Sequence, residues 1–267
     1  MIWPAETIWQ QLAALLPGIT VEVLPEIDST NTELMRRARQ GQTEAVLLVA
    51  ERQTAGRGRM GRSWQGEPGH TLMFSLGLPL APQDWSGLSL AVGLSLAHSL
   101  DPKSHHGVRL KWPNDLWLAQ SSGWAKLGGI LIETAVGPHS AERYCVIGVG
   151  LNLIAPQDLA LATPAVGWQS QDPQATAPSV LALVAAPLLQ DVLRFAQSGF
   201  APLQPAFAAR DALLGHRVSL SDGREGEALG VDTTGALRVR TAQGTETVHS
   251  SEVSVRPQPL PAPENRP

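Results

Sequence analysis

The sequence has little cysteine and lacks long apolar runs. Its single cysteine, Cys145, has no partner for an internal disulfide, and its place in the apolar run 144–149 predicts a buried thiol rather than a nucleophile. No run approaches the 18 apolar residues of a membrane span, and the first residues lack the basic and apolar pattern of a signal peptide. We therefore expect a cytoplasmic protein without a membrane partner and without cysteine chemistry.

The chain also lacks a broad excess of positive charge, internal repeats and metal-binding histidine spacing. Its 20 Lys and Arg against 24 Asp and Glu give a net charge of -4, whereas general binding to nucleic acid or anionic lipid needs a broad basic face. None of the seven histidines has the spacing of metal ligands. With 267 residues, the chain is long enough for one large domain, or for one large and one small domain.

Hydrophobic periodicity predicts an α+β fold in the first two-thirds of the chain. Four strand-like segments lie between residues 108 and 153 with little room for crossover helices, so we expect a mixed or largely antiparallel sheet with helices on one face. Thr30 and Glu33 fit a capping box at the start of a helix. The expected helices are 8–16, 30–40 and 85–100, and the expected strands are 21–27, 45–50, 71–78, 108–112, 116–118, 127–132 and 144–153.

The last third changes from helical to β-like patterns. We expect a helix over 179–197, kinked by Pro187, and a further helix from about 202 to 214. Short strands with glycine turns then predict a small β-barrel-like domain. The expected organisation is a large α+β domain (1–214), a small β-domain (215–256) and a proline-rich disordered tail (257–267).

A basic, glycine-rich stretch stands out in this acidic chain. Residues 51–64 contain four arginines and three glycines, and alternating arginine and glycine suits a loop that folds over an anion. A solvated flexible loop and an RGG-like nucleic-acid contact are alternative interpretations. The arginines are Arg52, Arg57, Arg59 and Arg62, and the glycines are Gly56, Gly58 and Gly61.

Two later stretches favour the anion-binding interpretation. Lys111-Trp-Pro-Asn-Asp115 places a base, a rigid turn, an amide and a carboxylate together, and Lys126-Leu-Gly-Gly begins an apolar strand. In this order, and with Ser29-Thr-Asn31 at a helix N-terminus, the motifs resemble those of the biotin protein ligases. The resemblance extends from Ser29 to Arg256. It implies a class II aminoacyl-tRNA synthetase-like catalytic domain of the biotin/lipoate ligase type, with a C-terminal SH3-like β-domain.

The resemblance also implies an activity. Biotin and MgATP would give biotinyl-5′-AMP, and the biotin would pass to a lysine of the biotin carboxyl carrier domain of acetyl-CoA carboxylase. The implied catalytic residues are Lys126, Arg59 and Asp115, and Asp115 is also the candidate magnesium ligand. The implied binding residues for biotin and ATP are Ser29, Thr30, Asn31, Gln53, Gly56, Arg57, Gly58, Arg59, Arg62, Trp64, Lys111, Asn114, Lys126, Gly128 and Asn152.

Several of these residues have structural alternatives. Lys126 fits an ordinary lysine at a strand end as well as a cation on a carboxylate, and Gly128 with Gly129 leaves room for a ligand. Gln53 could pair with a ureido group or lie exposed, and Trp64 could pack the base of the loop with partial ligand contact. Asp115 could hold magnesium, accept a proton from the attacking lysine, or hold Lys111 or Lys126 in place.

The function has alternatives too, from the same and from other classes. A lipoate or octanoate ligase of similar fold would also adenylate a small acid, and a non-catalytic nucleic-acid binder would use the arginine loop. About 28 residues precede Ser29, too few for a winged helix-turn-helix, so we expect the short form without DNA binding, as a monomer or a homodimer. The segment 116–125, with Trp124, is longer than the family pattern, so that pattern does not define the rim on the nucleotide side of the site.

Overall fold

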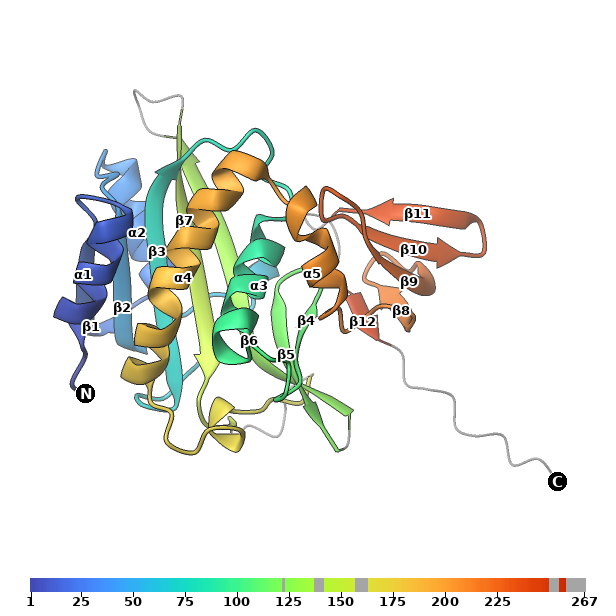
Figure 1. The fold of residues 1–267 in the computed structure, drawn as a ribbon, viewed down its shortest axis with the longest axis horizontal. Coiled ribbons are helices and arrows are strands. Elements are labelled where there is room, and N and C mark those ends of the chain that lie inside the picture. The colour runs from blue at the N-terminus through green and yellow to red at the C-terminus, as the bar shows by residue number, and fades with distance from the viewer. Residues whose placement is uncertain (122, 137–141, 157–162, 250–254, 258–267) are drawn as a thin grey trace.

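The chain forms a seven-stranded mixed sheet and a smaller five-stranded antiparallel sheet (Figure 1). The computed structural model describes residues 1–121, 123–136, 142–156, 163–249 and 255–257. The large sheet has the order β1-β2-β3-β7-β6-β5-β4, in which β1 runs parallel to β2 and every other neighbouring pair is antiparallel. Its strands are β1 (Thr20–Ile27), β2 (Val46–Gln53), β3 (Thr71–Leu80), β4 (Val108–Lys111), β5 (Asp115–Gln120), β6 (Gly123–Val136) and β7 (Arg143–Asn152).

Helices cover both faces of this sheet because its central strands β2, β3 and β7 are buried on both sides along most of their length. Alternate residues of β3, such as Leu72 and Phe74, pack into the main core with α1 (Ala5–Leu15), α3 (Leu88–Leu100) and α4 (Ala177–Ser198). On the other face, Leu34 and Met35 of α2 (Thr30–Arg39) pack in a second cluster with Leu48 of β2. The sheet is therefore the middle layer, with α3 and α4 in front of it in Figure 1.

The expected α+β fold with a mixed sheet is confirmed, with three local corrections. The expectation of helices on one face holds for α1, α3 and α4, whereas α2 lies on the opposite face. The N-cap of α2 is Ser29, not Thr30, since the Ser29 side chain accepts from the Thr32 N–H. The helix expected over 202–214 is only the 3-10 turn Ala201–Leu203 and α5 (Gln204–Ala208), because residues 210–212 leave the helix to hydrogen-bond with β4 at Leu110.

Helix α4 is long and apolar enough, by length and composition, to cross a membrane, with a mean hydropathy of 1.5 in its most apolar window. The core helix of a soluble protein meets the same criterion, and 44% of that window is buried inside the protein. Val184 and Leu188 of α4 belong to the main core, and Pro187 lies between them without ending the helix. In this structure, α4 therefore packs against the large sheet as part of the main core.

The small β-domain contacts the turn between β4 and β5. The indole Nε1 of Trp112, a fully buried side chain in that turn, donates to the Gly235 carbonyl at 3.0 Å, and Gln204 Nε2 donates to the Val231 carbonyl at 2.7 Å. Of the expected tail 257–267, only Pro257 lies within the described residues. The strands are β8 (Arg217–Leu220), β9 (Glu225–Val231), β10 (Leu237–Thr241), β11 (Gly244–Val248) and β12 (Val255–Pro257), in the order β11-β10-β9-β8-β12.

Candidate active site

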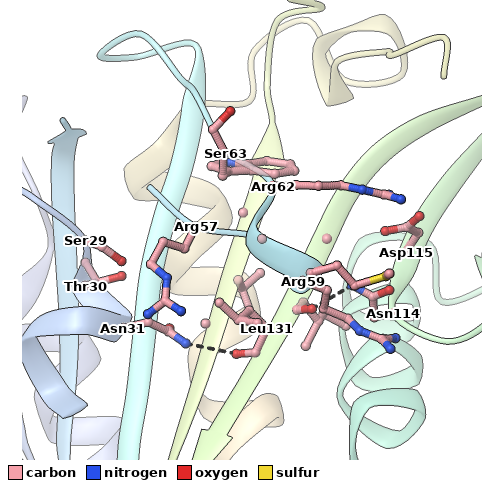
Figure 2. Close-up of a pocket in the computed structure, with 18 of the residues that line it drawn as sticks. Ser29, Thr30, Asn31, Arg57, Arg59, Arg62, Ser63, Asn114, Asp115 and Leu131 are labelled. Carbon is pink, nitrogen blue, oxygen red and sulfur yellow. Dashed lines mark hydrogen bonds between the residues drawn. The ribbon is translucent and has the colours of Figure 1, made fainter. Parts of the chain in front are cut away.

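A cavity opens on the face of the large sheet that carries α2 (Figure 2). Its floor is formed by the middle strands β6 and β7, and its sides by the N-terminus of α2 and the turn between β4 and β5. The arginine- and glycine-rich loop lies over it. The lining residues are Ser29, Thr30, Asn31, Gln53, Arg57, Gly58, Arg59, Met60, Arg62, Ser63, Trp64, Phe74, Lys111, Pro113, Asn114, Asp115, Lys126, Gly129, Ile130, Leu131, Gly148, Val149 and Gly150.

The covering loop is a small hairpin held by its own backbone. The Gly58 N–H donates to the Arg62 carbonyl at 2.7 Å, and the Trp64 N–H donates to the Gly56 carbonyl at 2.8 Å. Met60 at the tip has φ 56°, in the left-handed region that few side chains adopt, and its side chain is exposed. Three arginines of the loop, Arg57, Arg59 and Arg62, line the cavity, and an apolar side chain lies at its tip.

One end of the cavity is a polar cluster at the start of α2. The Thr30 N–H donates to Gln53 Oε1 at 2.7 Å, and the Thr30 and Ser75 hydroxyls lie 2.7 Å apart. Figure 2 shows Ser29 and Thr30 turned toward the space in front of Asn31, with Arg57 beside that amide. These hydroxyl and amide groups suit a neutral polar ligand with donors and acceptors close together.

The opposite end of the cavity is charged. Asp115 Oδ1 lies 2.6 Å from Lys126 Nζ, and Asp115 Oδ2 lies 3.6 Å from Lys111 Nζ, so one carboxylate holds two ammonium groups. Burial lowers the pKa of Lys111, an effect that Asp115 opposes and that Lys126 adds to. Lys111 is only 9% exposed and its ammonium lies over the Trp117 ring, 5.5 Å from the centroid. Asp115 thus fixes both cations at the edge of the cavity.

A β-bulge directs Lys126 into the cavity. The register between β5 and β6 shifts after Leu116, so that Leu116 pairs with Gly128 while Trp117 pairs with Lys126. Leu127 is the extra residue, and its side chain is fully buried in the main core. Because the bulge reverses the alternation of β6, Lys126 shares the face of Gly129, and a Cβ added to Gly129 would lie 3.4 Å from Lys126 Nζ. The bulge therefore allows a lysine and a core leucine to be sequence neighbours.

Glycines make the floor of the cavity flat. A Cβ at Gly148 would overlap Asn31 Oδ1, and one at Gly150 would overlap the Trp64 ring. These two glycines are not among the residues predicted from the sequence motifs. The sequence does contain a pattern that indicates them, because alternate glycines in an apolar strand are typical of a place where another group approaches the backbone. Gly148 and Gly150 therefore allow Asn31 of α2 and Trp64 of the loop to lie directly against the backbone of β7.

The cavity is strongly cationic within an acidic protein. Among the described residues that line it, five side chains are cationic and one is a carboxylate, whereas the chain as a whole has a net charge of -4. Burial lowers the pKa of the Arg59 guanidinium, while Asp115 opposes this effect. Figure 2 shows Arg59 and Arg62 on the side of Asp115 and Asn114, and Arg57 on the side of Asn31. Such a distribution suits a ligand, or a pair of ligands, with several negative charges.

The structure brings together most, but not all, of the residues selected from the sequence. Gly128 lies outside the cavity lining and faces the core, where an added Cβ would lie 2.5 Å from Leu151; its neighbour Gly129 lines the cavity instead. Gly56 and Asn152 also lie outside the lining: Gly56 closes the base of the loop, and Asn152 Nδ2 lies 3.5 Å from the Lys126 carbonyl. The selected residues that line it are Ser29, Thr30, Asn31, Gln53, Arg57, Gly58, Arg59, Arg62, Trp64, Lys111, Asn114, Asp115 and Lys126.

The long segment 116–125 contributes none of its described residues, 116–121 and 123–125, to the cavity lining. It extends the hairpin between β5 and β6, where Ala119 pairs with Trp124 and Gln120 pairs with Gly123. Trp124 is not among the residues that line the cavity. The added length therefore lengthens the hairpin of β5 and β6.

The geometry supports one of the three roles considered for Asp115. Both of its oxygens face ammonium groups, which favours holding the two lysines over binding a metal directly. Within the described residues, no group of three His, Cys, Asp or Glu side chains is placed to hold a metal ion. A divalent cation at this end would therefore depend on ligand oxygens rather than on a protein cage.

Comparison with known proteins relates the chain to a family of protein ligases. Residues 23–152 match the biotin/lipoate A/B protein ligase family, and residues 214–256 match the biotin protein ligase C terminal domain. The chain is 32% identical over 256 residues to the bifunctional ligase/repressor BirA of Escherichia coli, covering 92% of this chain and 77% of that protein. It is 32% identical over 245 residues to the biotin–[acetyl-CoA-carboxylase] ligase of Paracoccus denitrificans, covering 86% of this chain and 98% of that protein.

Solved structures agree with the sequence comparisons. The fold matches the biotin protein ligase of Aquifex aeolicus in complex with biotin and ATP with a TM-score of 0.72 and 26% identity, covering 89% of this chain and 99% of that one. The chain belongs to the biotin/lipoate A/B protein ligase family, as a biotin protein ligase with the C-terminal domain of that class. The family resemblance of the sequence motifs is thereby confirmed.

Proposed function

We propose that this protein is an ATP-dependent biotin–[acetyl-CoA-carboxylase] ligase. The observation that carries the proposal is the two-ended cavity, with a neutral polar cluster at Thr30 and Gln53 and a cationic cluster at Lys126, under one arginine-rich loop. Biotin has a matching shape, with a ureido ring at one end and a carboxylate at the other. Its ring would lie by the polar cluster, and its carboxylate would meet the α-phosphate of ATP near Lys126.

The first half-reaction joins two anions. A biotin carboxylate oxygen attacks the α-phosphorus, a new O–P bond forms, the bond to the bridging oxygen breaks, and pyrophosphate leaves with that electron pair. Lys126 would hold the carboxylate and a phosphate oxygen together, while Arg59 and Arg62 would neutralise charge on the phosphates. Asp115 would act as a positioning residue by fixing Lys126 at 2.6 Å and Lys111 at 3.6 Å. Trp64, which packs over Gly150, would cover the adenylate.

The second half-reaction transfers biotin to the carrier. The ε-amine of a carrier lysine, after losing its proton to solvent, attacks the biotinyl carbonyl carbon, an N–C bond forms, and the C–O bond to phosphate breaks to release AMP. Lys111 and Lys126 would stabilise the departing phosphate. Magnesium would arrive with ATP and be held mainly by phosphate oxygens, since it prefers such ligands and the oxygens of Asp115 already face two ammonium groups.

Biotin-dependent exchange of labelled pyrophosphate into ATP tests the first half-reaction. We expect exchange with biotin and none with lipoate or octanoate, which would instead support the alternative ligase. Lys126→Ala should reduce exchange by about 100-fold, the effect of losing roughly 3 kcal/mol of charge stabilisation. Near-normal exchange in this variant would contradict the role of Lys126, and no exchange with any acid in the unaltered protein would contradict the proposed function.

A further inference from the structure

A carboxylate next to the cavity joins the covering loop to the sheet. Glu133 lies on β6, two residues beyond Leu131, and is not among the residues that line the cavity. Its Oε1 lies 3.4 Å from Arg57 Nη1 in the loop, and its Oε2 accepts from Asn31 Nδ2 at 3.1 Å. One carboxylate therefore connects the loop, strand β6 and the N-terminus of α2.

The orientation of the Asn31 amide is fixed by its neighbours. Ser75 Oγ donates to Asn31 Oδ1 at 2.6 Å, and Asn31 Nδ2 donates to the Leu131 carbonyl at 3.2 Å and to Glu133. A flipped amide would place its oxygen against two acceptor oxygens, which is unfavourable. Both Nδ2 hydrogens are thus engaged by protein. Asn31, which is 4% exposed, therefore holds Glu133 in place rather than offering its amide hydrogens to a ligand.

The loop needs contacts to the sheet in order to stay over the cavity. The hydrogen bonds between Gly58 and Arg62 and between Gly56 and Trp64 join the loop to itself, so they preserve its shape without fixing its position. The Arg57 side chain is 51% exposed, whereas the Glu133 side chain is 22% exposed and is already hydrogen-bonded. Because one partner is held, forming this ion pair orders fewer side-chain torsions than forming a pair of two free side chains.

We propose that Glu133 is a positioning residue that latches the arginine loop over the end of the cavity that binds the biotin ring. The proposal rests on the proposed function of the same site. Glu133 pairs with Arg57 when the loop is closed, and the pair separates when the loop opens to admit or release a ligand. The latch contacts the polar end and lies away from the Asp115–Lys126 pair, so it acts on ligand retention and leaves the chemical step to the cationic end.

The latch predicts that loss of the Glu133 charge weakens ligand binding and leaves the chemical step unchanged. A partly exposed ion pair contributes up to about 1 kcal/mol, which corresponds to about a fivefold change in an equilibrium or a rate. Removing the charge of Glu133 should therefore raise the KM for biotin and the dissociation rate of biotinyl-AMP by about three- to fivefold. The kcat of pyrophosphate exchange at saturating biotin should stay within about twofold, because Lys126 and Asp115 are untouched.

The test compares Glu133→Gln with Glu26→Gln in the full chain. The new amide oxygen at this position can still accept from Asn31, but the neutral side chain no longer attracts Arg57. Glu26 pairs with Arg52 at 2.7 Å across the neighbouring strands β1 and β2, and neither residue lines the cavity. Its variant therefore makes the same change of charge at an ion pair outside the cavity. Release of pre-formed labelled biotinyl-AMP is followed by rapid filtration. We expect faster release from the first variant and unchanged release from the second.

A double variant checks that the effect passes through Arg57. If the latch is correct, Arg57→Gln combined with Glu133→Gln should release biotinyl-AMP no faster than Arg57→Gln alone. Additive effects, equal release by the unaltered protein and Glu133→Gln, or a loss of kcat in Glu133→Gln would each overturn the latch. If the unaltered protein neither forms nor retains biotinyl-AMP, the proposed function fails and the latch fails with it. Failure of the latch alone differs, because the unaltered protein then still forms and retains biotinyl-AMP.

Discussion

Replacing Asp115 with asparagine tests how one carboxylate organises two lysines. The substitution keeps the shape of the side chain but removes the charge that lies 2.6 Å from Lys126 Nζ and 3.6 Å from Lys111 Nζ. A hydrogen bond between charged groups is worth roughly 1.5–3 kcal/mol, so losing the contact to Lys126 should lower the exchange rate by about 10- to 100-fold. Lys126 would then be free to move away from Lys111.

The pH dependence gives a second and more specific readout. Asp115 is the group that opposes the lowering of the Lys111 pKa by burial and by Lys126, so in Asp115→Asn that pKa should fall further. If protonated Lys111 supports adenylation, activity in the variant should decline with rising pH earlier than in the unaltered protein. The assay is biotin-dependent pyrophosphate exchange between about pH 6.5 and 9 at constant ionic strength.

Asp191→Asn is the matched control for this experiment. Asp191 pairs with Arg194 at 3.0 Å on α4, on the other side of the sheet, so its loss should change neither the rate nor the pH profile. Unchanged exchange and an unchanged pH profile in Asp115→Asn would refute the argument. A lowered rate with an unshifted profile would leave Asp115 a role in holding Lys126 but refute the coupling to Lys111.

Three further predictions address the loop, the floor and the junction with the small β-domain. Arg59→Gly should retain biotinyl-AMP poorly, so that exposed lysines of added bystander proteins become biotinylated; equal retention and no stray labelling would argue against a lid. Gly148→Ala should raise the KM for biotin more than the KM for ATP, since the new Cβ would overlap Asn31 Oδ1, and equal effects on both would contradict this. Burial raises the pKa of Asp211 to about 6 from an ordinary value of 3.8. Because the unfolded chain loses this proton more easily, the carboxylate destabilises the fold increasingly as pH rises from about 4 to 6, by up to roughly 3 kcal/mol. Urea unfolding of Asp211→Asn should therefore show a stability relative to the unaltered protein that increases over that window and is constant above it, whereas a pH-independent difference would contradict the raised pKa.

The sheet and most helices could be predicted because their apolar periodicity is local. The strands around Leu72 and Ile147 follow from short apolar runs, and the structure has them close to the predicted boundaries. The end of α5 could not be predicted in the same way. Residues 210–212 have a sequence compatible with helix, but Arg210 is buried and its guanidinium donates to the carbonyls of Asp101 and Val108. These hydrogen bonds to residues distant in the chain override the local helix propensity of residues 210–212.

The cavity residues also divide into those that local motifs predict and those whose position depends on the folded sheet. Lys126, Asp115 and the arginines could be selected because their types and order form motifs, although motif position does not show which way a side chain points. The bulge at Leu127 decides that Lys126 and Gly129, rather than Gly128, face the cavity. Glu133 was not selected because its partners Asn31 and Arg57 are 102 and 76 positions away in the chain, and only the folded sheet brings the three together.

The hydrogen bond between Trp112 and Gly235 makes the small β-domain a part of the catalytic unit rather than a removable module. Truncation after α5 would leave the buried indole N–H of Trp112 without its acceptor, at a cost of roughly 1–3 kcal/mol, and would expose a large apolar ring beside Lys111 and Pro113. Shortened versions of this enzyme, made for crystallisation or as fusion tags, should therefore retain residues 215–249, or replace Trp112 with a side chain that needs no partner.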